Sequence, residues 1–106
     1  MTRNKDVYLP VRQTVVHSLK TDPKYLNAIG RGEKTFEVRK DDRGFKVGDW
    51  LVLREYDQRT KTYGPRWIGC KITYILDATA GFGLIRGWCV LGIQLPANHC
   101  WPPDGR

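Results

Sequence analysis

The chain has 106 residues, of which 41% are hydrophobic and 27% are charged, so it fits one globular domain with a modest core. Lysine and arginine outnumber aspartate and glutamate, giving a net charge of +7, and a basic surface attracts polyanions such as nucleic acids. No apolar run approaches the roughly 20 residues that span a bilayer, and the polar start Met1–Asp6 lacks the apolar segment of a secretory signal. We therefore expect a cytoplasmic protein with no membrane partner.

Three cysteines stand far apart in the chain, at Cys70, Cys89 and Cys100. An odd number of cysteines without a C-x-x-C pair is unlike a disulfide framework or a zinc site. His99 directly precedes Cys100, but no second pair of ligands stands at a suitable spacing. We therefore predict reduced thiols, no metal site and no cofactor.

The first part of the chain predicts a strand followed by a short helix. Residues 1–10 read as a loose lead-in, and the run of β-branched residues within 11–19 favours a strand. The sequence Thr-Asp-Pro at 21–23 combines a capping side chain with proline, which is a typical helix start. One apolar face and two terminating glycines complete this helix: Tyr25, Leu26 and Ile29 share the face, and Gly30 and Gly32 end it.

The segment Lys34–Lys40 alternates between apolar and polar side chains, and it predicts a half-buried strand. Phe36 and Val38 point to one side of this strand. The other side carries three hydrogen-bonding side chains in a row: Thr35, Glu37 and Arg39. Such a row serves either as a structural polar face or as a surface that meets a ligand.

The rest of the chain predicts three more strands, and the whole indicates an α+β domain. The strands are expected at 49–56, 66–76 and 88–95, after a polar connection at 41–48, with a hairpin turn in 57–64, a glycine-rich connection at 78–87 and an irregular tail at 96–106. Five strands and one or two short helices in so short a chain indicate a small, mostly antiparallel or mixed β-barrel, or a strongly curled sheet. Residues 1–106 then form a single domain with its core at about 11–95.

The most specific pattern of the chain lies between His17 and Tyr56. Residues 32–39 read G-x-K-T-x-E-x-R, and residues 45–49 read F-K-x-G-D. The sequence His-Ser-Leu-Lys at 17–20 precedes them, and Leu-Arg-Glu-Tyr at 53–56 follows. This succession of motifs resembles the ASCH-related branch of the PUA-like superfamily, among small bacterial and phage domains, and the resemblance runs from about Val15 to Leu95.

The resemblance implies a PUA-like fold, which is a mixed β-barrel with a helix after the first strand and a cleft beside that helix. In this superfamily the cleft binds RNA or modified nucleotides. One ASCH branch hydrolyses the amide of N-acetylated cytidine with a lysine, a threonine and a glutamate, and another is linked to cutting single-stranded RNA. Lys34 falls on the lysine of the hydrolase motif, whereas Glu37 stands where that branch has its threonine. Because fold does not fix function, the activity has to be argued from the site.

Seven residues are the candidates for binding RNA or a nucleotide: Lys20, Lys34, Thr35, Glu37, Arg39, Arg43 and Tyr56. The cations would contact phosphates, and Glu37 would accept a hydrogen bond from the edge of an unstacked base. If the protein is an enzyme, the candidate catalytic groups are Lys34, Glu37 and His17. Lys34 would be a nucleophile or oxyanion stabiliser, and Glu37 or His17 would be the base.

Several candidates also have a structural interpretation. Glu37 and Arg39 suit an ion pair that fixes a barrel, and His17 suits a hydrogen-bonded structural role at a strand end. Tyr56 suits a cap on the core, while Trp101 in the tail would either stack on a base or cover the end of the barrel. The tryptophans in predicted strands favour the core over a stacking platform: Trp50, Trp67 and Trp88.

The sequence is compatible with three functions. The first is a non-catalytic module that binds RNA or a nucleotide through a basic cleft. The second is a hydrolase, either a nuclease acting on single-stranded RNA or an amidohydrolase acting on a modified nucleoside. The third is a phage-type interaction domain whose basic surface meets an acidic protein partner. The sequence leaves the oligomeric state open.

Overall fold

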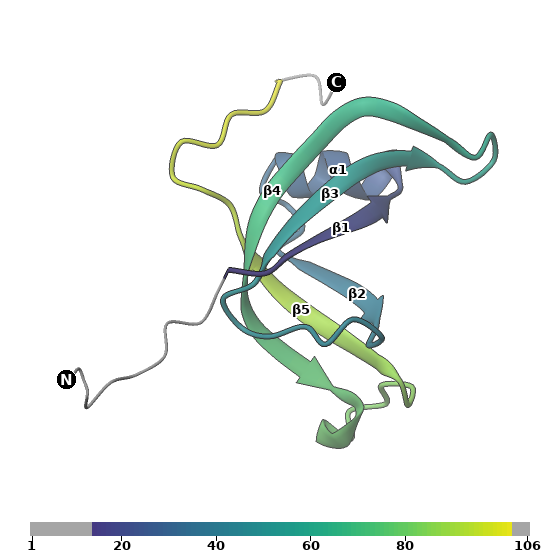
Figure 1. The fold of residues 1–106 in the computed structure, drawn as a ribbon, viewed down its shortest axis with the longest axis vertical. Helices are drawn as coiled ribbons and strands as arrows, with labels where there is room; N and C mark the ends of the chain where they lie inside the picture. Colours follow the sequence, from purple (N-terminus) through teal and green to yellow (C-terminus); the bar gives the residue numbers. More distant parts are fainter. Residues whose placement is uncertain (1–13, 103–106) are drawn as a thin grey trace.

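The computed structural model describes residues 14–102, which form a strongly curled β-sheet with one α-helix packed against it (Figure 1). In chain order the elements of this part are β1 (Val16–Thr21), α1 (Pro23–Gly30), β2 (Phe36–Lys40), β3 (Trp50–Asp57), β4 (Thr62–Asp77), the short 3₁₀ helix η1 (Ala78–Ala80) and β5 (Trp88–Gln94). Within the described range, no helix has the length and apolar character needed to cross a membrane.

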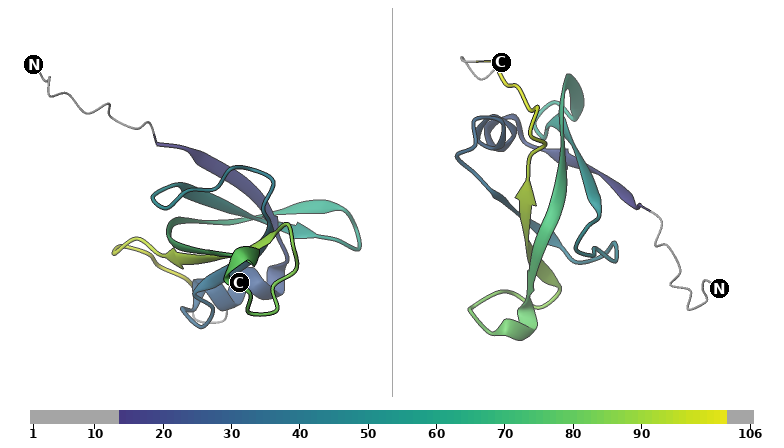
Figure 2. Two further views of the ribbon diagram at one scale, coloured as in Figure 1. Left: turned by 90° about the horizontal axis from the view of Figure 1, so that it is seen from below. Right: turned by 90° about the vertical axis from the view of Figure 1, so that its left-hand side faces the viewer.

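The five strands form one sheet in the order β1–β3–β4–β5–β2, so β1 and β2 are its two edges. β1 runs parallel to β3, and the other neighbouring pairs are antiparallel. The register shifts between Arg54 and Tyr56 on β3, and again between Ile72 and Tyr74 on β4. Because such irregularities increase the local bend and twist of a strand, they help the long β4 to curve around the core (Figure 2).

The curl brings the two edge strands close enough for arginine side chains to bridge them. Arg39 Nη2, from β2, donates to the carbonyl oxygen of Lys20 at 2.8 Å and to Thr21 Oγ1 at 3.2 Å, both on β1. Arg43, in the segment after β2, donates to the carbonyl oxygen of Ser18 at 3.1 Å. The sheet is therefore a half-barrel, and we refer to the gap between β1 and β2 as the seam.

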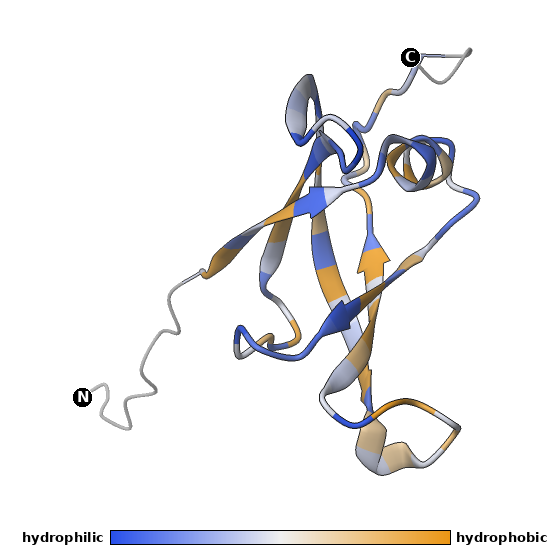
Figure 3. Cartoon of the chain, turned by 90° about the vertical axis from the view of Figure 1, so that its right-hand side faces the viewer, coloured by the Kyte–Doolittle hydropathy of each residue, from blue (hydrophilic) through white to orange (hydrophobic). Residues whose placement is uncertain are grey.

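The core lies between the inner face of the sheet and α1. Asp22 caps the helix by accepting from the Lys24 amide at 2.8 Å, and Pro23 occupies the first turn. Leu26 and Ile29 of the helix are buried against the sheet. Figure 3 shows hydrophobic and hydrophilic residues alternating along the strands, as a sheet with one covered face requires. The other buried apolar residues of the core are Leu19, Phe45, Leu51, Leu53, Ile68, Cys70, Ile72, Cys89, Leu91 and Ile93.

The structure confirms the α+β class, the helix start and the order of the predicted elements. The first strand begins at Val16, later than predicted, and residues 11–13 lie outside the described part, as do 1–10 and 103–106. The fourth strand begins at Thr62, earlier than predicted, because the hairpin turns within residues 58–61. Lys61 takes a left-handed φ of 56° in this turn, which lets the strand resume at once.

Three aromatic residues that were predicted to be buried are exposed. Tyr25 does not share the buried face of the helix, because it is 49% exposed while Leu26 and Ile29 are fully covered. Adjacent helical residues point in different directions, so Leu26 takes the inward position and Tyr25 the flank. Trp67 was expected in the core, yet it is 62% exposed on the outer face of β4. Trp88 is also partly exposed, at 37%.

The strand β2 alternates as predicted, but its polar side is the covered one. Glu37 is only 5% exposed, whereas Phe36 and Val38 on the other side are 43% and 47% exposed. The inner side of this edge strand faces the seam. There Glu37 pairs with Lys34 and Arg39, and Arg39 also bonds to β1. Polar residues are therefore buried here by pairing, and the apolar residues remain on the outer surface.

Candidate functional site

A small pocket opens beside α1 along β2, and two of the residues predicted to bind a ligand, Lys34 and Glu37, line it. It has a volume of about 350 Å³ and lies between α1, the connection that precedes β2, and β2 itself. We refer to it as the Lys34 pocket, and its lining residues are Tyr25, Lys34, Phe36, Glu37 and Val38.

The carboxylate of Glu37 is the buried acceptor of this pocket. Its side chain is 6% exposed, and its two oxygens accept from different cations. Lys34 Nζ lies 3.2 Å from Oε2, and Arg39 Nε lies 3.1 Å from Oε1. Because each carboxylate oxygen has two lone pairs, the two cations stabilise the charge and still leave capacity for a hydrogen bond from a ligand.

Lys34 is held at the mouth of the pocket by several groups. Its Nζ donates to the Phe36 carbonyl oxygen at 2.7 Å, in addition to its contact with Glu37. It also lies 4.9 Å from the ring centroid of Phe36 and 5.3 Å from that of Tyr25, where the ring faces attract a cation. Both rings are partly open to solvent, so the pocket offers aromatic surface next to a positioned positive charge.

The free edge of β2 adds backbone groups to the seam. The Thr35 carbonyl oxygen accepts from the Ile93 amide, which identifies the odd-numbered positions of β2 as those bonded to β5. Hydrogen-bonded positions alternate along an antiparallel pair. The backbone groups that face the seam therefore belong to Phe36, Val38 and Lys40.

A second pocket, of about 240 Å³, continues along the seam and shares Val38 with the first. Arg39 and Arg43 both line it, and each bridges to a carbonyl oxygen of β1. Asp42 lies 4.0 Å from Arg43, so the charge of this pocket is mixed. The remaining lining residues are Leu19, Lys40, Phe45 and Trp88.

His17 lies apart from the Lys34 pocket, although it was predicted to work with Lys34 and Glu37. Its Nε2 lies 2.8 Å from Asp49 Oδ2, and its ring packs edge-on against Phe45 at 4.8 Å. His17 precedes Thr21, the contact of Arg39, by four positions on β1, which is about 13 Å along a strand. The structure thus assembles Lys34 and Glu37, and it gives His17 buried partners of its own.

Five of the seven predicted ligand residues lie outside the lining of the Lys34 pocket; Arg39 and Arg43 line the second pocket, and the other three lie elsewhere. Lys20 contributes its carbonyl oxygen to the seam, but its side chain turns to the outer face, where Nζ lies 4.6 Å from the ring centroid of Tyr56. Tyr56 in turn packs edge-on against Tyr63. Thr35 is exposed and borders a separate hollow beside Ile93. Of the seven predicted ligand residues, Lys34, Glu37 and Arg39 therefore form one contact group.

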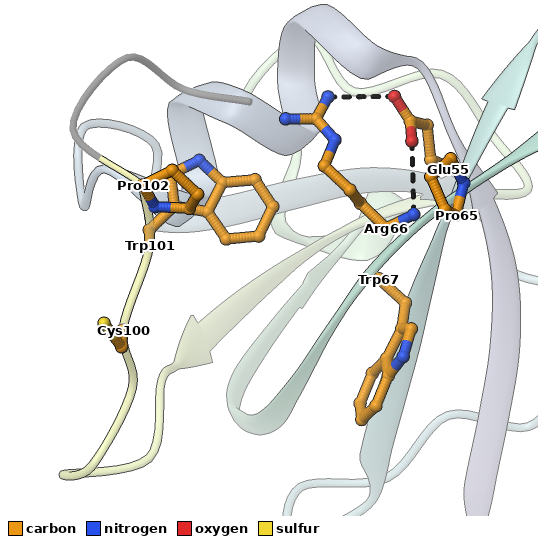
Figure 4. Close-up of a pocket in the computed structure, with 7 residues that line it drawn as sticks. All are labelled: Glu55, Pro65, Arg66, Trp67, Cys100, Trp101 and Pro102. Carbon is orange, nitrogen blue, oxygen red and sulfur yellow. Dashed lines mark hydrogen bonds and ion pairs between the residues drawn. The ribbon is translucent and has the colours of Figure 1, made fainter.

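A larger hollow, of about 670 Å³, lies between β4 and the tail (Figure 4). Its charged side chains already bond within the protein: Arg66 donates to Glu55 Oε2 at 2.9 Å and to Asn27 Oδ1 at 2.7 Å. The hydrogen bond from Arg66 lowers the pKa of Glu55 below its usual value. The guanidinium also lies 5.3 Å from the ring centroid of Trp101. These contacts fasten α1, β4 and the tail together, so we assign this hollow a structural role.

The cysteines do not add chemistry to the pocket. Cys70 and Cys89 are buried free thiols, whereas Cys100 is exposed. Burial raises the pKa of Cys70 to about 12, with a smaller contribution from the negative charge of Glu37. Burial also raises the pKa of Cys89 to about 11. Among residues 14–102, no group of three or more histidine, cysteine, aspartate or glutamate side chains is placed to hold a metal ion.

Sequence reasoning missed two aromatic residues of the pocket, Tyr25 and Phe36. Both were taken as apolar members of regular elements. A signal was present for Tyr25, because it directly precedes Leu26, and adjacent helical positions cannot both point inward. For Phe36 the polar face of the strand was the signal, because a buried ion-paired glutamate forces its neighbour outward.

These features define a class of protein: a small α+β domain whose half-barrel sheet carries a charged and aromatic pocket at its seam. The chain belongs to the family described as Domain of unknown function (DUF3850), whose model matches residues 16–93. It is also similar to the uncharacterized 12.9 kDa protein in the GpA 3′ region of Escherichia phage P2, with 36% identity over 62 residues. That match covers 58% of this chain and 55% of the phage protein, so the chain spans about half the length of this relative.

Proposed function

We propose that this domain is an RNA- or nucleotide-binding module of the PUA-like type, and that the Lys34 pocket receives one unstacked base. The observation that carries the proposal is the geometry around Glu37. Its buried carboxylate is held between Lys34 and Arg39, and two partly exposed aromatic rings stand at the same opening. An acceptor, a cation and stacking surface are the groups that protein sites use to recognise a single base.

In the proposed complex the base stacks on Tyr25 or Phe36 and directs an exocyclic amino group at Glu37. The open lone pairs of the carboxylate accept that amino group, as acidic side chains do with the N4 amino group of cytosine. Lys34 and the backbone groups of β2 at the seam supply further donors and acceptors. The pocket therefore favours cytosine or another amino-bearing base over uracil.

Two further observations support the assignment. The helix follows the first strand, and the sheet is mixed and curled with a pocket beside that helix, as the resemblance to the PUA-like superfamily predicts. The net charge of +7 favours a polyanionic partner and speeds its encounter. A nucleotide satisfies both the charge of the chain and the aromatic lining of the pocket.

A hydrolase built on the same pocket is the second candidate. The specific observation in its favour is the 3.2 Å contact between Lys34 Nζ and Glu37 Oε2, which places a cation beside a carboxylate. Such a pair can stabilise a developing oxyanion and accept a proton. Hydrolysis of oligocytidine by the wild type that is lost in both Lys34→Ala and Glu37→Gln would establish this version.

The proposal is tested by measuring the affinity of the full chain for cytidine monophosphate and for a short oligocytidine RNA. We expect Lys34→Ala to weaken the binding of cytidine monophosphate about tenfold or more, because a charge-assisted contact is lost. Lys46→Ala is the matched control, because Lys46 is an exposed lysine in the loop after β2. A Lys34→Ala protein that unfolds cooperatively and binds both ligands like the wild type would contradict the proposal.

A further inference from the structure

The outer face of the sheet carries a row of cationic and aromatic side chains that the Lys34 pocket does not use. Strand pairing places Lys20 of β1 opposite Arg54 of β3, and Arg54 opposite Trp67 of β4. A parallel row on the same face places Trp50 opposite Lys71. Side chains at directly opposed positions of neighbouring strands lie on one face and within reach of each other.

Trp67 is the exposed ring of this row. It is 62% exposed, and in Figure 4 it points away from Arg66 and Trp101. A Cβ atom at Gly69 would lie 3.6 Å from Cζ3 of Trp67, so the ring leans over the glycine along the surface of β4. One face of the indole thus meets the protein, and the other is presented to solvent, where a flat group can stack.

The cations of the row are positioned by aromatic rings. The Arg54 guanidinium lies 4.3 Å from the ring centroid of Tyr63, and Lys20 Nζ lies 4.6 Å from that of Tyr56. The two tyrosine rings contact each other edge-on at 5.0 Å. A guanidinium stacked on a ring keeps its N–H donors at its edge, which is the arrangement that binds phosphate oxygens.

The charged side chains of this row are of one sign. The strand segments 16–20, 50–54 and 67–71 contain Lys20, Arg54 and Lys71, and they contain no aspartate or glutamate. The seam differs, because Glu37 and Asp42 balance part of its positive charge. Phosphates therefore find a stronger cationic surface on the outer face than in the pocket that we assign to a base.

We propose that Lys20, Arg54, Trp67 and Lys71, which we call the outer strip, bind the continuing chain of a single-stranded RNA whose base occupies the Lys34 pocket. This inference rests on the proposed function. β1 is the rim between the two surfaces, because the carbonyl oxygen of Lys20 meets Arg39 in the seam while its side chain joins the strip. β1 is also an edge strand, so an RNA chain can cross it from the pocket to the outer face.

The acidic protein partner is less suited to this surface than RNA. The carboxylates of an acidic peptide complement the three cations, but they do not stack on the exposed indole between them. Every nucleobase has a flat face that stacks on tryptophan, and each nucleotide adds one phosphate for the cations. The combination of ring and charge therefore favours single-stranded nucleic acid.

The test compares the affinity of full-length variants for oligocytidine RNA and for cytidine monophosphate. We expect Trp67→Ala to weaken oligocytidine binding by about 5- to 150-fold, as loss of one stacked base does, and Trp67→Phe to restore most of it. Binding of cytidine monophosphate should not change, because one nucleotide fills only the pocket. Phe82→Ala is the matched control, because Phe82 is an exposed aromatic residue in the connection between β4 and β5.

The cations are tested by the dependence of oligocytidine affinity on salt. Removing one phosphate contact by Arg54→Ala or Lys71→Ala should lower the slope of log affinity against log salt by about 0.7. Arg86→Ala, in the connection between β4 and β5, should leave the slope unchanged. The two substitutions in the strip act on different strands, so a local packing defect at one of them does not produce both results.

The outcomes separate the outer strip from the pocket. If Trp67→Ala, Arg54→Ala and Lys71→Ala all bind oligocytidine like the wild type, the inference is overturned, while loss of cytidine monophosphate binding in Lys34→Ala still supports the pocket. If only the strip variants lose oligocytidine and Lys34→Ala keeps both ligands, RNA binding by the strip stands, while the base-binding role of the Lys34 pocket and the link between the two surfaces are overturned. A wild-type protein that binds neither ligand at low salt overturns both.

Discussion

Among single residues, Glu37 is a charged group in a demanding environment. It is buried, and it is flanked by Lys34 and Arg39 at hydrogen-bonding distances. Burying a carboxylate is costly unless cations and donors compensate for the lost water. The same arrangement fixes the two basic side chains that the pocket presents to a ligand, so stability and recognition depend on one group.

Replacing this carboxylate should destabilise the fold. Glu37→Gln leaves Lys34 and Arg39 without their shared negative partner, and we expect a loss of about 3 kcal/mol in the free energy of unfolding, as for other broken buried pairs. Urea denaturation measures it. Glu33→Gln is the matched control, because the Glu33–Arg31 pair at 3.0 Å is exposed, and it should leave the urea midpoint unchanged. Equal midpoints for wild type and Glu37→Gln would refute the role given to Glu37.

Glu55 is a hydrogen-bonded carboxylate that contributes to the pH dependence of stability. The hydrogen bond from Arg66 lowers its pKa in the folded state, so its contribution is present above the unfolded value of about 4.3 and is lost as pH falls through the folded value. Glu55→Gln should cost about 1–2 kcal/mol at neutral pH, and the difference from wild type should shrink below about pH 4. Thermal melts across pH 3–7 measure this, and a pH-independent difference would contradict it.

At the scale of elements, α1 is fastened on two sides. Its inner side packs Leu26 and Ile29 into the core, and its C-terminal end meets the tail through Gly30. A Cβ atom at Gly30 would overlap the ring of Trp101, and His99 Nε2 lies 3.0 Å from the Gly30 carbonyl oxygen. The glycine is therefore required for close approach of the tail, since its backbone angles are ordinary for a helix.

A double-mutant cycle tests this contact between the helix and the tail. Gly30→Ala should destabilise the wild type by about 1–3 kcal/mol, because it forces Trp101 away. In a Trp101→Ala background the same substitution should be neutral or slightly stabilising, since alanine favours the helix over glycine. Chemical denaturation of the four proteins gives the coupling energy. Equal effects of Gly30→Ala in both backgrounds would show that the tail does not pack on Gly30.

On the scale of the whole molecule, short sequence patterns predicted where the helix and strands lie. They did not predict as well which face of each element is buried. The Asp-Pro start of α1 and the alternation in β2 depend on neighbouring residues, so the sequence suffices for them. Which face of β2 is covered depends on β1, which lies across the seam and is distant in sequence. A rule that buries the apolar face therefore fails for this edge strand.

In the candidate site, too, contacts between residues close in sequence could be predicted, whereas contacts that depend on strand pairing could not. The motif at residues 32–39 places Lys34, Glu37 and Arg39 close together in sequence, and strand geometry puts Glu37 and Arg39 on one side, so their contact was foreseeable. The separation of His17 from this group depends on the register of β1 against β3 and on Asp49. The outer strip depends on two strand registers at once, and no local pattern in the sequence contains that information.

The central claim is that the Lys34 pocket holds a base whose amino group meets Glu37, and amide NMR spectra of the full chain titrated with cytidine monophosphate test it most directly. We predict that the shifting resonances cluster at Tyr25, at Lys34 and along β2, and that uridine monophosphate binds about tenfold more weakly because it lacks the amino group. Shifts confined to other parts of the molecule, or no shifts at high nucleotide concentration, would contradict the claim.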